Sequence, residues 1–142
     1  MSLILNISSS DSIVSEIVQT AATTAGAEFL QAYDAFNFDV LLNKLEESKR
    51  DKVFVLFRED VPLQRISKNV YRQNYFYNVA IVYKQMVRAK HETGISAAQT
   101  LMETLASALV ANHQIVLNSV NRILTEDSLI ILSLRFSLDV LQ

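Results

Sequence analysis

The first segment of the chain has hydrophobic residues at helical spacing behind a polar run. Residues 8–12 are four serines and one aspartate, all typical helix N-cap residues. From Ile13 onward the apolar side chains follow a 3.6-residue period, which predicts an amphipathic helix over about 12–25. Gly26 stands where a C-cap glycine would end that helix. Before the helix, we expect residues 1–10 to form an N-terminal arm or an extra strand.

Two further helices are predicted downstream. Asn37 is a cap residue, and the apolar residues behind it form one side of a short helix that ends in the charged stretch 46–52. A longer helical period covers 95–112, whose Ala and Ser content suits close packing against a sheet. Residues 27–36 keep no clear period, so no element is assigned to them.

Strand patterns occupy the middle and the end of the chain. Residues 53–57 are a continuous run of β-prone apolar residues, which predicts a buried strand. Over 75–83 both alternating faces are apolar, so this strand is expected to be covered on more than one side. The segments 115–124 and 129–141 predict a closing hairpin. The strict alternation within 129–141 predicts one buried and one exposed face.

The order of these elements indicates the fold class. The predicted order is helix, short helix, strand, long strand, helix, strand, strand, and 142 residues are the size of one domain. We therefore expect a single α+β domain over 1–142, with a mostly antiparallel sheet and helices packed on one of its faces. No linker, low-complexity tract or repeat divides the chain.

The composition narrows the class of protein. The chain has 2 Gly, 1 Pro and no Cys. The shortage of Gly and Pro argues against collagen-like, disordered and turn-rich all-β proteins. The absence of Cys excludes a disulfide scaffold, a thiol nucleophile and a cysteine-ligated metal. Because no signal-peptide pattern is present at the start either, we expect synthesis inside the cell.

The apolar content is high for a protein without a membrane span. Hydrophobic residues make up 50% of the chain, and the mean hydropathy is +0.19. The longest apolar run, 53–57, is far shorter than the ~20 residues that cross a bilayer, so no membrane association is expected. The surplus fits either an unusually rich core or a surface buried between subunits. We favour the second explanation and expect strand 75–83 to form that interface.

Candidate catalytic residues are few. His91 and His113 lie at opposite ends of the long predicted helix, so one helix cannot bring them together. Acidic pairs occur at 46–47 and 126–127, but adjacent side chains diverge on a helix or in a turn. No phosphate-binding loop, nucleophile elbow or metal-binding histidine spacing occurs. We therefore expect no catalytic residue, no metal and no cofactor, and an enzyme is the class that the sequence favours least.

Aromatic residues cluster in the long extended segment, with basic residues between them. Such a cluster can stack on nucleic-acid bases, but aromatic residues in a strand also pack across neighbouring strands. We favour packing in the core or at a subunit interface. The residues concerned are Tyr71, Tyr75, Phe76, Tyr77 and Tyr83.

Charge is distributed unevenly along the chain. The total of 13 Lys and Arg nearly balances 15 Asp and Glu, yet residues 1–43 contain five acidic residues and no basic one. Residues 65–90 contain six basic residues and no acidic one. The basic segment can meet the acidic segment within one fold or across a head-to-tail interface between copies, or it can face phosphates. We favour contact between the two segments, because their opposite charges are comparable. The candidate subunit-interface or DNA-facing residues are Arg65, Lys68, Arg72, Lys84, Arg88 and Lys90.

The organisation of the chain resembles one known family, the tail-terminator proteins of tailed bacteriophages. The resemblance covers most of the chain and rests on the order and size of the elements, since the family has no strict motif. Residues 1–7 depart from the pattern as an apolar extension. The matching features are the N-terminal amphipathic helix, the strand 53–57, the aromatic strand 75–83, the helix 95–112 and the closing hairpin.

This resemblance implies a small α+β virion protein that forms a ring, expected to be a hexamer. Such a ring caps the tail tube, stops its polymerisation and contacts the head-completion or neck protein. DNA passes through the lumen without sequence-specific binding. The implied location is the tail–neck region of the virion, after assembly in the host cytoplasm. Within the basic segment we expect Arg72, Lys84 and Arg88 to face the ring contact or the DNA.

Other functions remain open from the sequence. One is another phage neck or head-completion protein of the same size. A second is a small nucleic-acid-binding module that uses the basic segment 65–90. A third, a small-molecule-binding domain, would need a pocket with convergent polar groups, which the sequence does not indicate.

Overall fold

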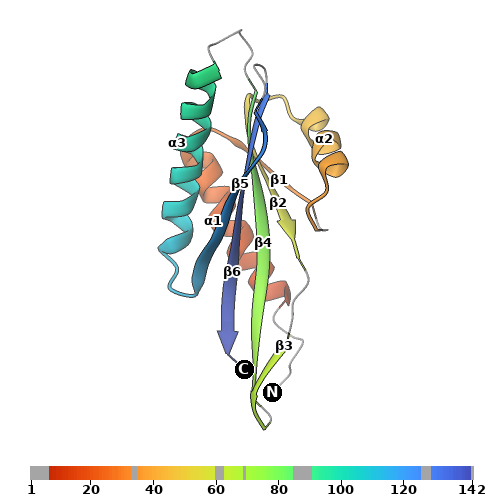
Figure 1. Ribbon diagram of the computed structural model, residues 1–142, viewed down its shortest axis with the longest axis vertical. Helices are drawn as coiled ribbons and strands as arrows, with labels where there is room; N and C mark the ends of the chain where they lie inside the picture. Colours follow the sequence, from red (N-terminus) through yellow and green to blue (C-terminus); the bar gives the residue numbers. More distant parts are fainter. Residues whose placement is uncertain are drawn as a thin grey trace.

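Three helices pack on a six-stranded sheet in the computed structural model (Figure 1). The structure describes residues 7–32, 35–59, 63–68, 70–84, 91–125 and 129–141. The elements in chain order are α1 (Ile7–Ala25), β1 (Glu28–Gln31), α2 (Phe38–Glu47), β2 (Lys52–Arg58), β3 (Leu63–Ser67), β4 (Val70–Lys84), α3 (His91–Val110), β5 (Ile115–Thr125) and β6 (Leu129–Leu141).

The sheet is mixed but mostly antiparallel. Its strand order is β1-β2-β4-β6-β5, and β3 pairs with β4 off this path. Only β1 and β2 pair in parallel, whereas the other described pairs are antiparallel. The predicted α+β class is confirmed.

The first helix begins earlier than the sequence predicted. The structure starts α1 at Ile7, so the serines of the polar run lie inside the helix and do not cap it. The reason is that this run contacts the sheet: the Ser10 hydroxyl is buried against Tyr77 of β4. An arm or extra strand over 1–10 is therefore wrong for residues 7–10, and residues 1–6 lie outside the described part of the chain.

The end of α1 is the predicted glycine cap. Gly26 has a φ of 71°, the left-handed conformation that glycine adopts without steric cost. The Gly26 N–H donates to the Thr23 carbonyl at 3.2 Å, and the Ala27 N–H donates to the Ala22 carbonyl at 2.7 Å. These two bonds are those of a Schellman motif, which satisfies carbonyls at the helix end.

The short helix α2 forms as predicted from its cap. The Asn37 side-chain oxygen accepts hydrogen bonds from the Asp39 and Val40 backbone amides at 2.9 and 3.3 Å. Leu41 and Leu45, one turn apart, are buried. The sequence assigned no element to 27–36, but the structure places β1 there, with Glu28 beside Val53 and Gln31 beside Leu56 of β2.

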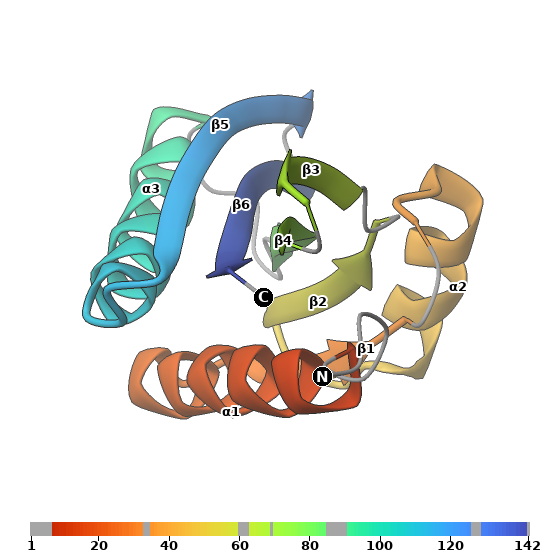
Figure 2. The same ribbon diagram turned by 90° about the horizontal axis from the view of Figure 1, so that it is seen from below.

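The helices lie on both faces of the sheet, not on one face as predicted (Figure 2). The α1 and α3 side chains pack with Phe54 and Leu56 of β2 in the larger core. The α2 side chains pack on the opposite face in a second core. The physical reason is that β2 is apolar on both of its faces and needs two covers. The second core contains Ala32, Leu41, Leu45, Val53, Val55, Phe57, Ala80, Val82 and Ile131.

The central strand β4 is covered on both faces within one chain. Val79 and Ile81 lie in the larger core, and Ala80 and Val82 lie in the second core. The prediction that two sides of this strand are covered is confirmed. Its middle is therefore filled by the fold itself and is not where apolar surface remains exposed.

The last strand, β6, is more buried than its alternation predicted. Leu134 and Phe136 face the larger core as expected, but Ser133 and Ser137 on the other face are also buried. The prediction of one exposed face is therefore wrong for these positions. Figure 2 shows the reason: the twisted sheet curls, so its α2 side becomes a concave interior.

Candidate functional site

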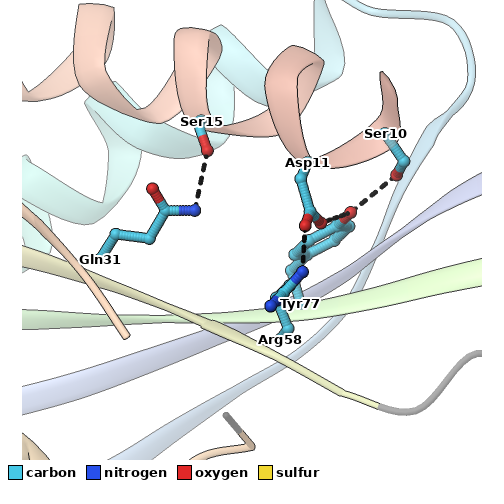
Figure 3. A network of polar contacts seen from close by, with 6 residues as sticks. All are labelled: Ser10, Asp11, Ser15, Gln31, Arg58 and Tyr77. Carbon is cyan, nitrogen blue, oxygen red and sulfur yellow. Dashed lines mark hydrogen bonds and ion pairs between the residues drawn. The ribbon is translucent and has the colours of Figure 1, made fainter. Parts of the chain in front are cut away.

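A buried polar network ties the first helix to the sheet (Figure 3). The Tyr77 hydroxyl donates to the Asp11 carboxylate at 2.8 Å. Because that bond uses its only proton, the Tyr77 hydroxyl accepts the hydrogen bond from the Ser10 hydroxyl, at 2.7 Å. Arg58 of β2 pairs with the same Asp11 carboxylate. Burial raises the pKa of Tyr77, so its hydroxyl stays a protonated donor at neutral pH.

A second polar cluster lies on the opposite face of the sheet. The Arg135 guanidinium of β6 lies 3.0 Å from the Glu59 carboxylate that follows β2, and Asn78 of β4 donates to that carboxylate at 2.6 Å. Arg135 also lies over the Phe76 ring, 4.3 Å from its centroid. The first cluster joins a helix to two strands and the second joins strands of the sheet, so both stabilise the fold.

Three of the exposed large hydrophobic side chains among the described residues belong to β5. This strand lies at one end of the sheet, and its seven residues from 116 to 122 are all exposed. Val116 is 54% exposed, Leu117 37% and Val120 56%. A long edge strand with exposed apolar side chains is the feature that proteins cover by association. We refer to residues 116–122 as the β5 edge.

The two faces of the β5 edge are set by its pairing with β6. Leu117, Val120 and Arg122 pair with residues of the larger core, so they point to the α1 and α3 side. Val116 and Asn121 pair with Ser137 and Ser133, so they point to the α2 side. Register shifts at Leu117/Ser119 and Arg122/Leu124 interrupt the simple alternation.

The helix side of the β5 edge borders a shallow groove beside α3. Arg122 is exposed there, and the part of the chain that the structure describes contains no ion pair to it. The groove is lined by Gln99, Met102, Glu103, Val120, Arg122 and Leu132. A cation that is exposed and unpaired within the chain is available to a carboxylate on another molecule.

The three predicted basic residues whose side chains the structure describes do not share one surface. Arg65 and Lys68 are exposed in and next to β3, at one end of β4. Lys84 is at the other end of that strand, about 45 Å away at 3.3 Å per residue. Arg72 lies within β4, but its side chain is outside the described part, as are residues 88 and 90 in full.

Lys84 has a role inside the fold. Its ammonium group donates to the Leu45 carbonyl at 3.1 Å and to the Ser48 carbonyl at 3.4 Å. These carbonyls belong to the C-terminal end of α2, where a cation complements the helix dipole. Lys84 is half-buried by these contacts. The Lys84 ammonium group therefore stabilises the contact between β4 and the end of α2.

Three tyrosines of the aromatic cluster pack in or against the larger core, while the Tyr71 side chain lies outside the described part of the chain. Tyr75 and Tyr77 are buried in the larger core, and the Tyr77 ring stacks on Phe136 with centroids 5.6 Å apart. Burial also raises the pKa of Tyr75. Tyr83 packs against the same core. For these tyrosines, core packing is confirmed over a platform for bases.

The histidines remain apart, as the sequence predicted. His91 is the first residue of α3, and His113 is exposed in the turn after it. Within the described ranges, no group of three or more His, Cys, Asp or Glu side chains could hold a metal ion. Among those same residues, no helix has the length and apolar character needed to cross a membrane.

Sequence reasoning missed the β5 edge. The segment has Val116, Leu117 and Val120 among Asn and Ser residues, so it lacks the clean alternation of a half-buried strand. That loss of alternation was the available signal of exposure on both faces. Comparisons with known proteins add no assignment: no protein-family model matches the chain, and a search of curated proteins finds no match.

Proposed function

We propose that the protein is a structural subunit of a homo-oligomeric ring, the tail terminator of a tailed bacteriophage. The observation that carries the proposal is the β5 edge. The strand β5 is eleven residues long, lies at one end of the sheet and exposes three large apolar side chains. Exposed apolar edges of this length are unfavourable in a protein that stays monomeric. Association of copies removes that cost.

The sheet has two different ends, which favours a ring over a two-fold dimer. A contact between unlike patches repeats from copy to copy and closes into a ring when the rotation allows it. The uneven charge of the chain supports the same arrangement, because residues 1–43 carry acidic residues and no basic ones. The α+β class and the size of the chain agree with the tail-terminator resemblance.

In this proposal the ring caps the tail tube, stops its elongation and binds the head-completion or neck protein. The β3–β4 hairpin supports such contacts, since Arg65 and Lys68 are exposed at its end (Figure 1). Basic residues there suit a DNA-filled lumen that is bound without sequence preference. The place of action is the tail–neck region of the virion, and no catalytic step is part of the role.

The test is a tube-elongation assay with the tail tube protein that the proposal requires as a partner of this chain. Adding the protein during polymerisation should fix the tube length, and electron microscopy should show a ring at one tube end. Unchanged tube length with no ring overturns the tail-terminator assignment. A complex with the neck protein but not with the tube would instead identify a head-completion protein.

A further inference from the structure

We infer that the β5 edge of one copy pairs with the free edge of β1 in the next copy, so that the sheet continues through the ring. This inference rests on the proposed function, because it names the two surfaces by which copies associate. Within the described strands, β5 has β6 as its partner and β1 has β2, so each leaves one edge open. Figure 2 shows β5 and β1 on different sides of the molecule.

The strand directions favour this pairing. β1 is parallel to β2, while β2–β4, β4–β6 and β6–β5 are antiparallel steps, so β5 runs opposite to β1. If neighbouring copies are related by a rotation about an axis parallel to the strands, every strand runs in the same direction in each copy. The new pair is therefore antiparallel, the more stable form of strand pairing.

The exposed large hydrophobic residues among the described ones lie on or near the β5 edge and on the helices beside β1. Val116, Leu117 and Val120 are on the β5 edge, and Val110 ends α3 shortly before β5. The remaining exposed large hydrophobic side chains among the described residues belong to the two helices that flank β1 in Figure 2. They are Ile13 of α1 and Phe38 of α2.

Charge is complementary across the proposed contact. β5 contains Arg122 and no acidic residue. The helices beside β1 expose Glu16 on α1 and Asp39 on α2, and α2 also carries Lys44 in its last turn. Arg122 of the β5 edge therefore has the carboxylates of Glu16 and Asp39 available on the neighbouring copy, which favours contact between the unlike edges.

The faces of the two strands define a cross-linking test. Gln31 of β1 points to the α1 side, where it donates to the Ser15 hydroxyl at 3.2 Å (Figure 3). Leu117, Val120 and Arg122 point to that side from β5, while Ser119 and Asn121 point to the other. In a continuous sheet, only the first three can approach Gln31 of the neighbouring copy.

The chain contains no cysteine, so each engineered disulfide reports on a designed pair alone. Gln31→Cys is combined with Leu117→Cys, Val120→Cys or Arg122→Cys to scan the register, and each variant is oxidised mildly. We expect a ladder of covalent multimers from at least one pair. The matched pairs with Ser119→Cys or Asn121→Cys should link at least tenfold more slowly. Circular dichroism verifies the fold of every variant.

A second pair on the α2 side makes the test independent of Gln31. Glu28 pairs with Val53 of the second core, so Glu28→Cys with Asn121→Cys should link whereas Glu28→Cys with Val120→Cys should not. The inference is overturned if wild-type copies associate but no same-face pair links, or if Val120→Cys alone gives covalent dimers by β5–β5 contact. A wild-type protein that stays monomeric overturns the proposed function itself.

Discussion

Tyr77 is the residue that fixes α1 against the sheet. Its ring lies in the larger core, and its hydroxyl reaches the second turn of the helix through Ser10 and Asp11. Buried polar groups need such partners because their desolvation is costly. The network therefore determines where α1 lies over β4.

Replacing Tyr77 by Phe should lower the free energy of unfolding by about 1–3 kcal/mol, because the buried Ser10 hydroxyl and the Asp11 carboxylate each lose a hydrogen bond. Urea denaturation measures this change. Tyr83→Phe, a half-buried tyrosine of the same strand, is the control and should stay within about 0.5 kcal/mol. Equal losses in both variants would contradict the role of the Tyr77 hydroxyl.

The same hydroxyl predicts a pH dependence of stability. Burial raises the pKa of Tyr77 above the ordinary value of 10.0. Above pH 10, the unfolded chain therefore releases this proton before the folded chain does, and the free energy of unfolding falls as the pH rises. Tyr77→Phe should show a shallower decline over this range in urea titrations at stepped pH. Parallel declines in the two proteins would refute the expectation.

Substitution of Gly26 tests the cost of backbone strain alone, because a new side chain makes no contacts there. A Cβ added there meets no atom within 4 Å, and the φ of +71° is the only obstacle. Gly26→Ala should cost about 1 kcal/mol of unfolding free energy, and Gly26→Asn less, since Asn tolerates this conformation better. Thermal denaturation of the two variants compares them. An Ala variant as stable as the Asn variant would argue against strain.

At the level of elements, the sequence predicted most of the segments with strong periodicity. The helix capped by Asn37, the apolar run in β2 and the closing hairpin all formed. β1 was missed because four residues hold no period, and its place depends on parallel pairing with β2. The face covered by α2 was also mispredicted, because the two-sided pattern of β2 does not say which helix covers which side.

Lys84 connects β4 to the end of α2, and this contact gives a prediction. Lys84→Met keeps the aliphatic stem but removes the hydrogen bonds to the Leu45 and Ser48 carbonyls. We expect a loss of about 1 kcal/mol in unfolding free energy, measured by urea denaturation. Lys68→Met, at the exposed end of the β3–β4 hairpin, should leave stability unchanged. A Lys84 variant as stable as the wild type would contradict a stabilising role for these hydrogen bonds.

At the scale of the whole molecule, the apolar surplus divides between two cores and one exposed edge. The surplus was predicted from composition, but its assignment to strand 75–83 was wrong for the positions that the two cores bury. Exposure of an edge depends on strand order, and strand order depends on pairings between distant segments. The pattern of apolar and polar residues along the sequence therefore could not locate the β5 edge. That some apolar surface is buried between subunits remains a prediction from composition.

A charged residue introduced on the β5 edge should prevent association of copies but leave folding unchanged. Val120→Lys places an ammonium group in the proposed contact, while the 56% exposure of Val120 leaves unfolding free energy within about 0.5 kcal/mol of the wild type. Ser96→Lys, on the exposed side of α3, is the matched control. Sedimentation velocity should show dissociation of the first variant only. Loss of stability in Val120→Lys would mean that the edge belongs to the core.

The most direct test of self-association is the mass of the wild-type particle. Size-exclusion chromatography with light scattering, run over a range of concentrations, gives this mass without a partner protein. We predict a particle of several copies of the 16.0 kDa chain, reduced to one copy by Val120→Lys. A mass of 16.0 kDa for the wild type at every concentration would contradict the account.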